Sequence, residues 1–515
     1  MAAAAWSLEA PQRQDVLRRI TASICCLAQA RGVEIPEDEA YTTAVGLERK
    51  AYTTAEVSSN VTTGSRPIVE TTKGYTRKLA ELVLEAVQNG GKSAAGGGAS
   101  SSEAASVDLL GSRDFMTKES TEEALAAMLA PGSVVSKIRF STKSFGRDAA
   151  NVASAAITNC SASLTDADMS DVIAGRPEEE ALDALRILGE ALSKCGLKVI
   201  NLSDNALGEK GVRAAADAFT GQAALESMSL QNVGCSIHAC KAVEELLTKS
   251  QALKQLHLFN NMTDNAGAIY ISKILARAPM MEDFKLASSR VGPQGGNALA
   301  RALCAGTALT KLDLSDNPMT ADVAAALAAC VAYQPNLRHL NLNDTSLTDE
   351  GIEVVCRALT GSALKLEQLE LALNEVTPDG AKAVAIAMLG KPCLWSVNVR
   401  ENELEDRGAV IIAKAVAAMP ALRLIDACGN QIKRVGAVAL ARAAVSRPAL
   451  ELLALDENFM SEAGLDEVRG LFEAAGKAGA LGPLDENMEE DDEELDDDDD
   501  DGEDELSAAL AKAAL

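Results

Sequence analysis

Aromatic residues make up only 3% of this 515-residue chain, although 47% of its residues are hydrophobic. Its core must therefore be built from Leu, Ala, Val and Ile, which favours many thin repeated layers over one core centred on aromatic rings. Only three histidines occur, His238, His257 and His339, which excludes a histidine-rich metal cluster. We expect neither a metal site nor a cofactor.

The chain also lacks the usual signals of membrane insertion and of a disulfide framework. It has no run of 18 uncharged apolar residues, so no transmembrane segment is expected. Residues 1–5 contain no Lys or Arg, which makes them a poor secretory signal. The 11 cysteines are odd in number and include no C-x-x-C pair, so reduced thiols are expected.

Basic residues are scarce relative to acidic ones. There are 48 Lys and Arg against 75 Asp and Glu, and the net charge is −27. A run at 485–505 holds 17 of the acids, and without it the net charge is −10. Such a chain repels nucleic acid, so we expect no nucleic-acid partner and favour a basic protein.

Composition sets two boundaries along the chain. Residues 481–515 are predicted to form an acidic disordered tail, which serves either solubility or the docking of a basic partner. Within it, Leu506 to Leu515 can form only a marginal helix. Gly, Ser and Ala dominate residues 89–106, so we place a flexible linker and approach segment at 89–130. Residues 1–88 show apolar stripes at helical spacing and are predicted to form a small helical domain.

A leucine-rich pattern repeats through the rest of the chain. The motif L-x-x-L-x-L-x-x-N recurs ten times at steps of 28 residues, with a single step of 29, and two looser copies precede it at Val135 and Leu164. The first positions of the ten copies are Leu197, Leu225, Leu253, Met281, Leu309, Leu337, Leu366, Leu394, Leu422 and Leu450. This period and motif are those of leucine-rich repeats.

The repeat predicts the fold class, which is α/β. We expect a leucine-rich-repeat solenoid of about twelve units over 131–480, with parallel strands on the concave face and helices on the convex face. The repeated leucines point inward, and the Asn that ends each motif can satisfy backbone groups in the bend. Residues between the leucines, such as Asn201 and His257, form a broad polar surface that suits a protein partner better than a small substrate.

Catalytic motifs are missing as well. The sequence contains no G-x-x-x-x-G-K-[ST], no H-E-x-x-H and no G-x-S-x-G. The glycine-rich stretch 91–98 lacks the lysine of a phosphate loop, which leaves the linker interpretation. We therefore do not expect the chain to be an enzyme itself.

Irregular repeats indicate where function lies. The step from Leu164 to Leu197 is 33 residues, and the added loop at 170–185 carries Arg176. In the copy that starts at Leu225, the position of the bend Asn holds Val233, and Asn232 precedes it. We predict that Asn232 projects from the rim at the strand ends, and that Asn260 does the same. Ordinary turn residues are the alternative at these positions.

Several segments of the chain resemble Ran GTPase-activating proteins. They are KIRFSTKSFG (137–146), SDVIAGRPEEEAL (170–182), INLSDNALGEKG (200–211), FNNMTDNAGA (259–268) and the acidic C-terminal run. The N-terminal unit resembles the WPP domain of the plant and algal members, although Trp6-Ser7-Leu8 stands where that domain has Trp-Pro-Pro.

The resemblance implies an activator that binds Ran in its GTP form and orders the GTPase's own catalytic Gln, without an essential arginine finger. It implies that Asn232 is the catalytic residue that positions this Gln. It implies partner contacts at Arg176, Asp204, Asn260 and Asp316. The implied location is cytoplasmic, with anchor proteins of the outer nuclear envelope as further partners of the N-terminal domain. The alternative function is a non-catalytic scaffold or inhibitor that binds a basic protein.

Overall fold

The computed structural model describes residues 20–21, 44, 105–488 and 503–513. The chain divides into two compact units, Met1–Ser102 and Glu103–Leu515. In the first unit, Ile20, Thr21 and Ala44 are helical and buried. The remainder of the helical domain predicted at 1–88 lies outside the described residues.

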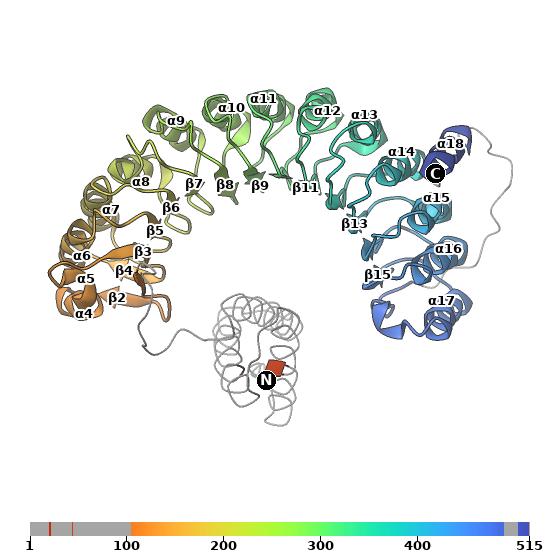
Figure 1. Cartoon of the computed structure of the whole chain (residues 1–515), viewed down its shortest axis with the longest axis horizontal. Helices are drawn as coiled ribbons and strands as arrows, with labels where there is room; N and C mark the ends of the chain where they lie inside the picture. Colours follow the sequence, from red (N-terminus) through yellow and green to blue (C-terminus); the bar gives the residue numbers. More distant parts are fainter. Residues whose placement is uncertain (1–19, 22–43, 45–104, 489–502, 514–515) are drawn as a thin grey trace. The chain divides into compact units, whose positions relative to one another are not determined.

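One curved parallel sheet runs through the second unit. Thirteen strands pair in chain order, interrupted only where β2 and β4 form a separate two-stranded sheet. The thirteen strands line the inner side of the arc in Figure 1. The strands are β1 Ala105–Asp108, β2 Asp114–Met116, β3 Val135–Arg139, β4 Lys143–Phe145, β5 Asp166–Asp168, β6 Val199–Asn201, β7 Ser227–Ser229, β8 Gln255–Phe259, β9 Asp283–Ala287, β10 Lys311–Asp313, β11 His339–Asn341, β12 Gln368–Glu370, β13 Ser396–Asn398, β14 Leu424–Asp426 and β15 Leu452–Ala454.

Helices cover the outer side of this arc (Figure 1). From β5 to β15 each strand is followed by its helix, as a 28-residue unit requires. The helices are α4 Lys118–Ala124, α5 Ala126–Leu129, α6 Arg147–Asn159, α7 Glu178–Leu192, α8 Gly208–Ala214, α9 Ile237–Leu246, α10 Asp264–Leu275, α11 Pro293–Leu303, α12 Ala324–Tyr333, α13 Thr348–Thr360, α14 Pro378–Leu389, α15 Glu405–Ala417, α16 Arg434–Val445, α17 Glu462–Ala474 and α18 Glu503–Ala513, with 3-10 turns η1 Ala216–Ala218, η2 Ala321–Val323 and η3 Ala478–Ala480. The predicted leucine-rich-repeat solenoid is confirmed.

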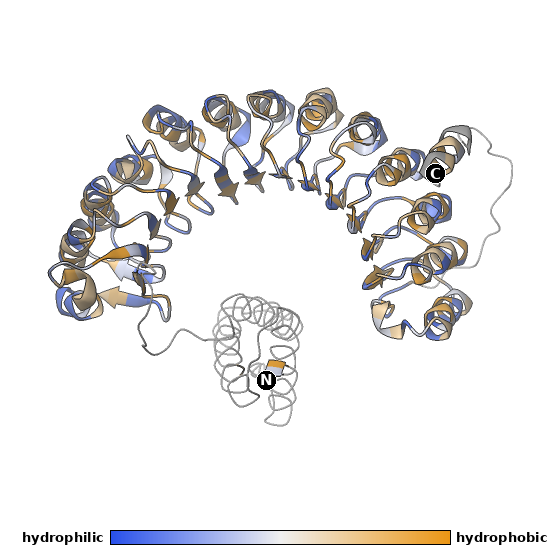
Figure 2. Ribbon diagram, viewed as in Figure 1, coloured by the Kyte–Doolittle hydropathy of each residue, from blue (hydrophilic) through white to orange (hydrophobic). Residues whose placement is uncertain are grey.

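The core is a stack of leucines between the sheet and the helices. The middle residue of each short strand points inward, so Leu312 and Leu340 are buried and pair directly across β10 and β11. In Figure 2, hydrophobic (orange) and hydrophilic (blue) residues alternate along the strands and helices of the arc. A glycine recurs near the start of eight helices and permits close helix packing, because a Cβ on Gly295, for example, would lie 2.8 Å from the Cβ of Ala268.

A column of buried asparagines closes the bends after the strands. Asn317 shows the pattern: its Oδ1 accepts from the backbone N–H of Ser289 (3.2 Å) and of Val291 (2.9 Å). Its Nδ2 donates to the carbonyls of Leu286 (2.8 Å) and Leu314 (2.9 Å). Each such asparagine joins two repeats. It also provides hydrogen bonds for buried backbone N–H and C=O groups, which would destabilise the fold if they were left without a partner.

The solenoid starts earlier than the repeat motif predicted. The segment 105–130, placed in the linker at 89–130, contains β1, β2, α4 and α5. Strand β1 pairs with β3 and adds a thirteenth strand to the twelve expected. Leu125 and Met128 are fully buried against the first regular repeat. Since an end repeat needs only one apolar face, this cap lacks the leucine motif by which the other repeats were recognised.

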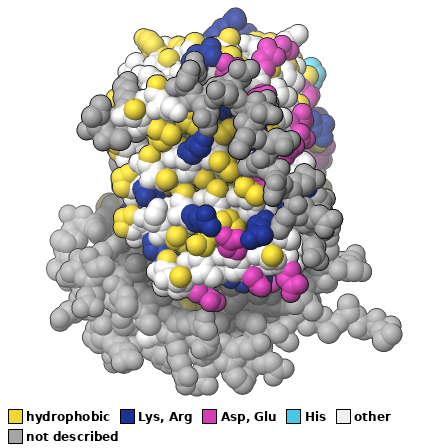
Figure 3. Space-filling model, turned by 90° about the vertical axis from the view of Figure 1, so that its right-hand side faces the viewer, with side chains coloured by type: hydrophobic (Ala, Val, Ile, Leu, Met, Phe, Trp, Pro, Cys, Tyr) yellow, Lys and Arg dark blue, Asp and Glu magenta, His cyan; other side chains and the backbone are white. Residues whose placement is uncertain are grey.

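The other end also differs from the predicted tail at 481–515. Leu484 is buried, and the Oδ1 of Asn487 accepts from the Asn458 N–H at 3.0 Å, which adds one more step to the asparagine column. Residues 489–502 lie outside the described residues. Helix α18 packs against α14, and its Leu506 is buried. Figure 3 views the C-terminal repeats, where apolar side chains lie among charged ones.

Candidate functional site

One residue in every repeat turns the chain away from the concave face. It lies seven residues after the first motif position and has a φ between 49° and 67°. We call these residues the turn row: Thr142, Asp171, Asp204, Asn232, Asn260, Ser288, Asp316, Asp344, Leu373, Glu401, Gly429 and Glu457. Asn, Asp and Gly tolerate this left-handed conformation best, which explains their frequency here. Adjacent strands are about 4.8 Å apart, so the side chains follow one another closely.

Three predicted site residues form a hydrogen-bonded chain in this row. The Asn232 Nδ2 donates to Asp204 Oδ1 at 3.2 Å, and the Asn260 Nδ2 donates to Asn232 Oδ1 at 3.1 Å. All three side chains are exposed. An amide has two N–H groups and two acceptor lone pairs, so Asn232 keeps one of each for a partner. We call these three residues the amide chain.

The backbone below the amide chain is firmly held. The N–H of Asn232 donates to the carbonyl of Phe259 at 2.7 Å. Val233 is fully buried, and its N–H donates to Asn261 Oδ1 at 3.2 Å. The bend is thus completed by Asn261 from the next repeat, and the Asn232 side chain has no part in it. This is the arrangement that Val233 at the bend position predicts.

A cysteine pair supports the same turn from inside. The Sγ atoms of Cys235 and Cys240 lie 3.4 Å apart, and both residues are fully buried. The hydrogen bond with Cys240, together with burial, raises the pKa of Cys235 well above its usual value. These thiols therefore act as small packing groups.

Asp316 belongs to the turn row but lies four strands away from Asp204. It is exposed and starts an acidic stretch of the row. Burial, then the charges of Asp316 and Glu401, raise the pKa of the neighbouring Asp344. The structure therefore does not bring Asp316 into the amide chain.

Arg176 is bound to other residues of the chain. Its Nε donates to Ser144 Oγ at 3.0 Å, and its Nη2 donates to the carbonyls of Ser144 (2.7 Å) and Met116 (3.2 Å). Its Nη1 lies 3.5 Å from Glu180, and its guanidinium lies 4.9 Å from the centre of the Phe115 ring. The side chain is only 15% exposed. These contacts make Arg176 a link between the cap and the first repeats, and the partner contact that the resemblance implies for it stays a prediction.

The concave face carries paired charges. His257 Nε2 lies 2.9 Å from Asp283 Oδ1, and His339 Nε2 lies 2.9 Å from Glu370 Oε1. Although burial alone would raise the pKa of Asp283, the hydrogen bond and charge of His257 hold it below its usual value. Both histidines are thus in hydrogen-bond contact with a carboxylate of the next strand on the concave face.

Phe259 is a feature of the concave face that sequence reasoning missed. It is 39% exposed, and the Nζ of Lys285 lies 4.9 Å from the centre of its ring. Lys285 is also paired with Asp313 at 2.8 Å. The signal was present in FNNMTDNAGA, where an aromatic residue directly precedes Asn260.

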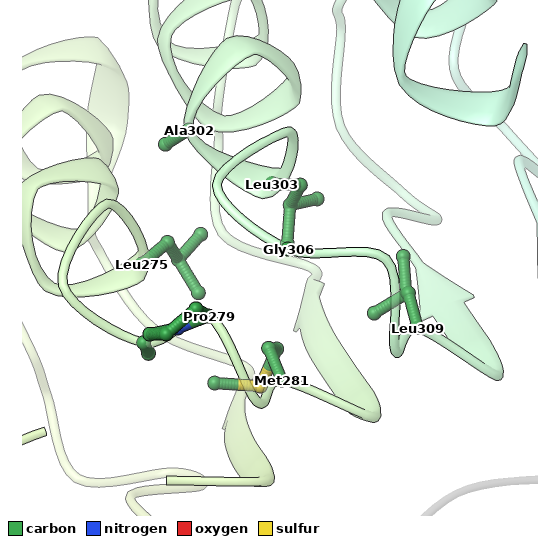
Figure 4. A pocket seen from close by; sticks show the side chains of 8 residues that line it. Leu275, Pro279, Met281, Ala302, Leu303, Gly306 and Leu309 are labelled. Carbon is green, nitrogen blue, oxygen red and sulfur yellow. The ribbon is translucent and has the colours of Figure 1, made fainter. Parts of the chain in front are cut away.

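The described residues offer little for a small ligand at the turn row. Figure 4 shows an apolar gap between the ends of α10 and α11, lined by Leu275, Ala278, Pro279, Met281, Ala302, Leu303, Gly306 and Leu309. A Cβ on Gly306 would lie 1.9 Å from the Pro279 carbonyl oxygen, so this gap is a tight packing seam. An open depression of about 390 Å³ lies between α4 and α6, also away from the turn row.

Among the described residues, no three His, Cys, Asp or Glu side chains lie together so that they could hold a metal ion. None of the described helices combines the length and the hydropathy needed to span a bilayer.

The curved sheet, the outer helices and the asparagine column define a leucine-rich-repeat protein. A family model described as Leucine Rich repeat matches residues 333–356 and 363–385. RAN GTPase-activating protein 2 of Arabidopsis thaliana is 37% identical over 468 residues, which covers 77% of this chain and 85% of the relative. The chain belongs to the family of Ran GTPase-activating proteins.

Two other relatives match shorter stretches. RAN GTPase-activating protein 1 of Arabidopsis thaliana is 38% identical over 157 residues, covering 30% of this chain and 29% of the relative. The ribonuclease inhibitor of Sus scrofa is 28% identical over 200 residues, covering 38% of this chain and 44% of the relative. The chain thus spans less than half the length of each of these two.

Proposed function

We propose that this chain accelerates GTP hydrolysis by Ran in its GTP form, and that it does so by ordering a Gln of the GTPase. In small GTPases a Gln orients the attacking water, while the nucleotide and Mg²⁺ are bound by the GTPase. Family membership supports the activity, and the exposed amide chain of Asp204, Asn232 and Asn260 supports the mechanism.

Asn232 is the central member of that chain and is held from both sides. One hydrogen bond to Asp204 and one from Asn260 fix the plane of its amide. A neutral amide with a free N–H and a free lone pair can hold another amide, such as that of the partner's Gln, without adding charge. Fixing the group before the partner arrives reduces the entropy lost in reaching the reactive geometry.

Activation without an arginine from this chain is part of the proposal. An inserted arginine contributes about 10³–10⁵ in rate where it is used. The guanidinium of Arg176 is already bound to carbonyl and hydroxyl oxygens inside the chain, which supports a structural role. Arg290 is exposed and has no hydrogen bond or ion pair within the described part of the chain, so it is the arginine to test.

The proposal extends to the partner surface and to the location. Asp204, Asn260 and Asp316 would contact Ran along the turn row, where basic side chains fit the acids. The N-terminal unit would bind anchor proteins of the nuclear envelope, and the protein would act in the cytoplasm. The resemblance of residues 1–88 to a WPP domain motivates this second part.

Phosphate release from Ran·GTP tests the activity. With the chain at about one hundredth of the Ran concentration, we expect complete hydrolysis with many turnovers for each molecule. Stoichiometric binding without faster hydrolysis would instead establish a scaffold or inhibitor, a function that the similarity to a ribonuclease inhibitor favours. When the protein is at a saturating concentration, Arg290→Lys should retain the rate of GTP hydrolysis. The substitution keeps the charge but removes the planar fork that an arginine finger needs, so it tests whether Arg290 acts as such a finger.

A further inference from the structure

The strands next to the amide chain are longer than their neighbours. Strands β8 and β9 each have five residues, whereas β6, β7 and β10 have three. Pairing between β8 and β9 continues to Phe259↔Ala287. The backbone of Phe259 is therefore fixed in a parallel ladder at a point where the adjacent strands have already ended.

Phe259 differs from every equivalent residue of the other repeats. The equivalent positions, six residues after the first motif position, hold small or polar side chains: Ser141, Ser170, Ser203, Gln231, Ala287, Ser315, Asn343, Ala372, Arg400, Cys428 and Asp456. The solenoid therefore does not require an aromatic residue at this position. Single exposed apolar residues are common, so Phe259 is informative only together with its surroundings.

The surroundings hold the ring in place beside Asn232. The carbonyl of Phe259 accepts the N–H of Asn232 at 2.7 Å. The ammonium of Lys285 lies 4.9 Å from the ring centre, within the range of a cation–π contact, and is held by Asp313 at 2.8 Å. Three residues further on, Met262 is 53% exposed. A rigid aromatic ring that borders a fixed polar group is typical of a binding hot spot.

We propose that Phe259 is the apolar anchor of the interface with the GTPase, and that its ring receives an apolar side chain of that partner beside Asn232. This inference rests on the proposed function. In it, Phe259 supplies affinity for the GTPase, while Asn232 supplies the increase in hydrolysis rate. Lys285 orients the ring from its position above it. Contact with the ring also removes water from around the amide chain, which strengthens its hydrogen bonds to the partner.

Steady-state GTP hydrolysis with increasing Ran·GTP separates the two contributions. Phe259→Ala should raise KM about 30-fold and change kcat by less than about threefold, because a central aromatic contributes binding in the ground and transition states alike. Phe259→Tyr keeps the ring and should stay within about threefold of the original KM. The thermal unfolding of both variants should match that of the unchanged protein, since the side chain is exposed.

Tyr333→Ala is the matched control, because Tyr333 is an aromatic residue that is 52% exposed at the end of α12, on the outer side of the arc and away from the turn row. It should leave KM unchanged. An unchanged KM for Phe259→Ala overturns the anchor, and so does an equal rise in KM for Tyr333→Ala. A protein that binds Ran·GTP without accelerating hydrolysis overturns the proposed function instead. Calorimetric binding to Ran with a non-hydrolysable GTP analogue then still tests the anchor by the same 30-fold criterion.

Discussion

Asn232 and Val233 are neighbours in the chain with opposite surroundings. Val233 is fully buried in the bend, while the side chain of Asn232 is exposed and bound to side chains of the two adjacent repeats. In most other repeats the bend position itself holds Asn, as at Asn205 and Asn317. The replacement by Val leaves Asn232 as the polar residue of this turn, and its substitution can test catalysis separately from folding.

Removing the Asn232 amide should reduce the rate and preserve the fold. Asn232→Gly is the suitable change, because φ is 53° and an alanine would add backbone strain. We expect the rate of single-turnover GTP hydrolysis at saturating chain to fall about 10²-fold or more, as for the loss of one positioning donor. The free energy of unfolding should change by less than about 1 kcal/mol.

Asn260→Gly provides the comparison within the amide chain. It removes the donor to Asn232 Oδ1 but leaves the Asn232 amide itself in place. We expect a loss of about tenfold in the same assay, because the amide is then held from one side only. A full rate for Asn232→Gly would show that the amide chain does not act in catalysis.

Arg176→Ala should reduce stability and leave the saturated rate of the folded molecules unchanged. It removes a 15% exposed guanidinium together with its bonds to Ser144 and Met116. The loss of such hydrogen bonds leaves buried acceptors unpaired and costs about 2–4 kcal/mol. Urea unfolding measures the loss, and hydrogen exchange should increase first in β2 and β4.

Arg186→Ala is the control for that change. Arg186 lies on α7, is 60% exposed and pairs with Asp183, so its loss should cost less than about 0.5 kcal/mol. If Arg176→Ala were as stable as Arg186→Ala but inactive at saturation, Arg176 would be an arginine finger after all.

Lys391 makes stability depend on alkaline pH. It is 2% exposed, and its Nζ donates to the carbonyls of Leu359 and of Ser362. Burial lowers the pKa of Lys391 to about 8, against 10.5 for a free lysine. Below pH 8 both states bind the proton and the folded state carries the full cost of a buried charge. Between pH 8 and 10.5 only the unfolded state binds it, so stability should rise with pH by up to about 3 kcal/mol.

The chain itself supplies the control for Lys391. Gln334 occupies the same position of an earlier repeat and donates its Nε2 to the carbonyls of Leu303 and Gly306, both at 2.9 Å. Lys391→Gln should keep such bonds without the charge. We expect urea midpoints that are higher at pH 7 and no longer rise between pH 8 and 10.5. The same rise in both proteins would mean that another group causes it.

Helix α18 should be held on α14 by apolar contacts. α14 carries the half-buried Ile386 where the neighbouring helices carry the exposed Arg357 and Lys414. Leu506 of α18 is 4% exposed. Leu506→Asp would bury a charge, so α18 should detach and hydrogen exchange in α14 should rise about tenfold or more, with α12 unaffected. Equal exchange in α14 before and after the change would contradict this packing.

The fold could be predicted because a 28-residue period fixes strand, bend and helix at once. Leu312 and Leu340 are buried and paired as the motif requires. The exposure of Asn232 could be predicted because Val233 takes the bend position beside it, whereas its role in catalysis comes from the family resemblance and stays a prediction. In both cases the contacts that matter, the pairing of Leu312 with Leu340 and the hydrogen bonds of Asn232, occur between neighbouring repeats, so the repeat pattern describes them.

The features that were missed depend on contacts that the repeat does not describe. Arg176 lies in an inserted loop, and its burial comes from Met116, which belongs to a cap without the motif. The docking of α18 on α14 joins segments more than 100 residues apart. Phe259 lay inside a segment used for the resemblance, yet the motif specifies neither the extra length of β8 nor the exposure of this ring.

The turn row separates what the protein can bind from what makes it fold. Its positions share one backbone conformation and, apart from the buried Asp171, lie outside the core, so exchanging Asp, Asn, Ser or Gly there leaves the stack of leucines intact. A single substitution in the turn row can therefore create a new pair of side chains on adjacent repeats. A solenoid of this kind can acquire, lose or shift a recognition site along its length during evolution without passing through an unstable intermediate.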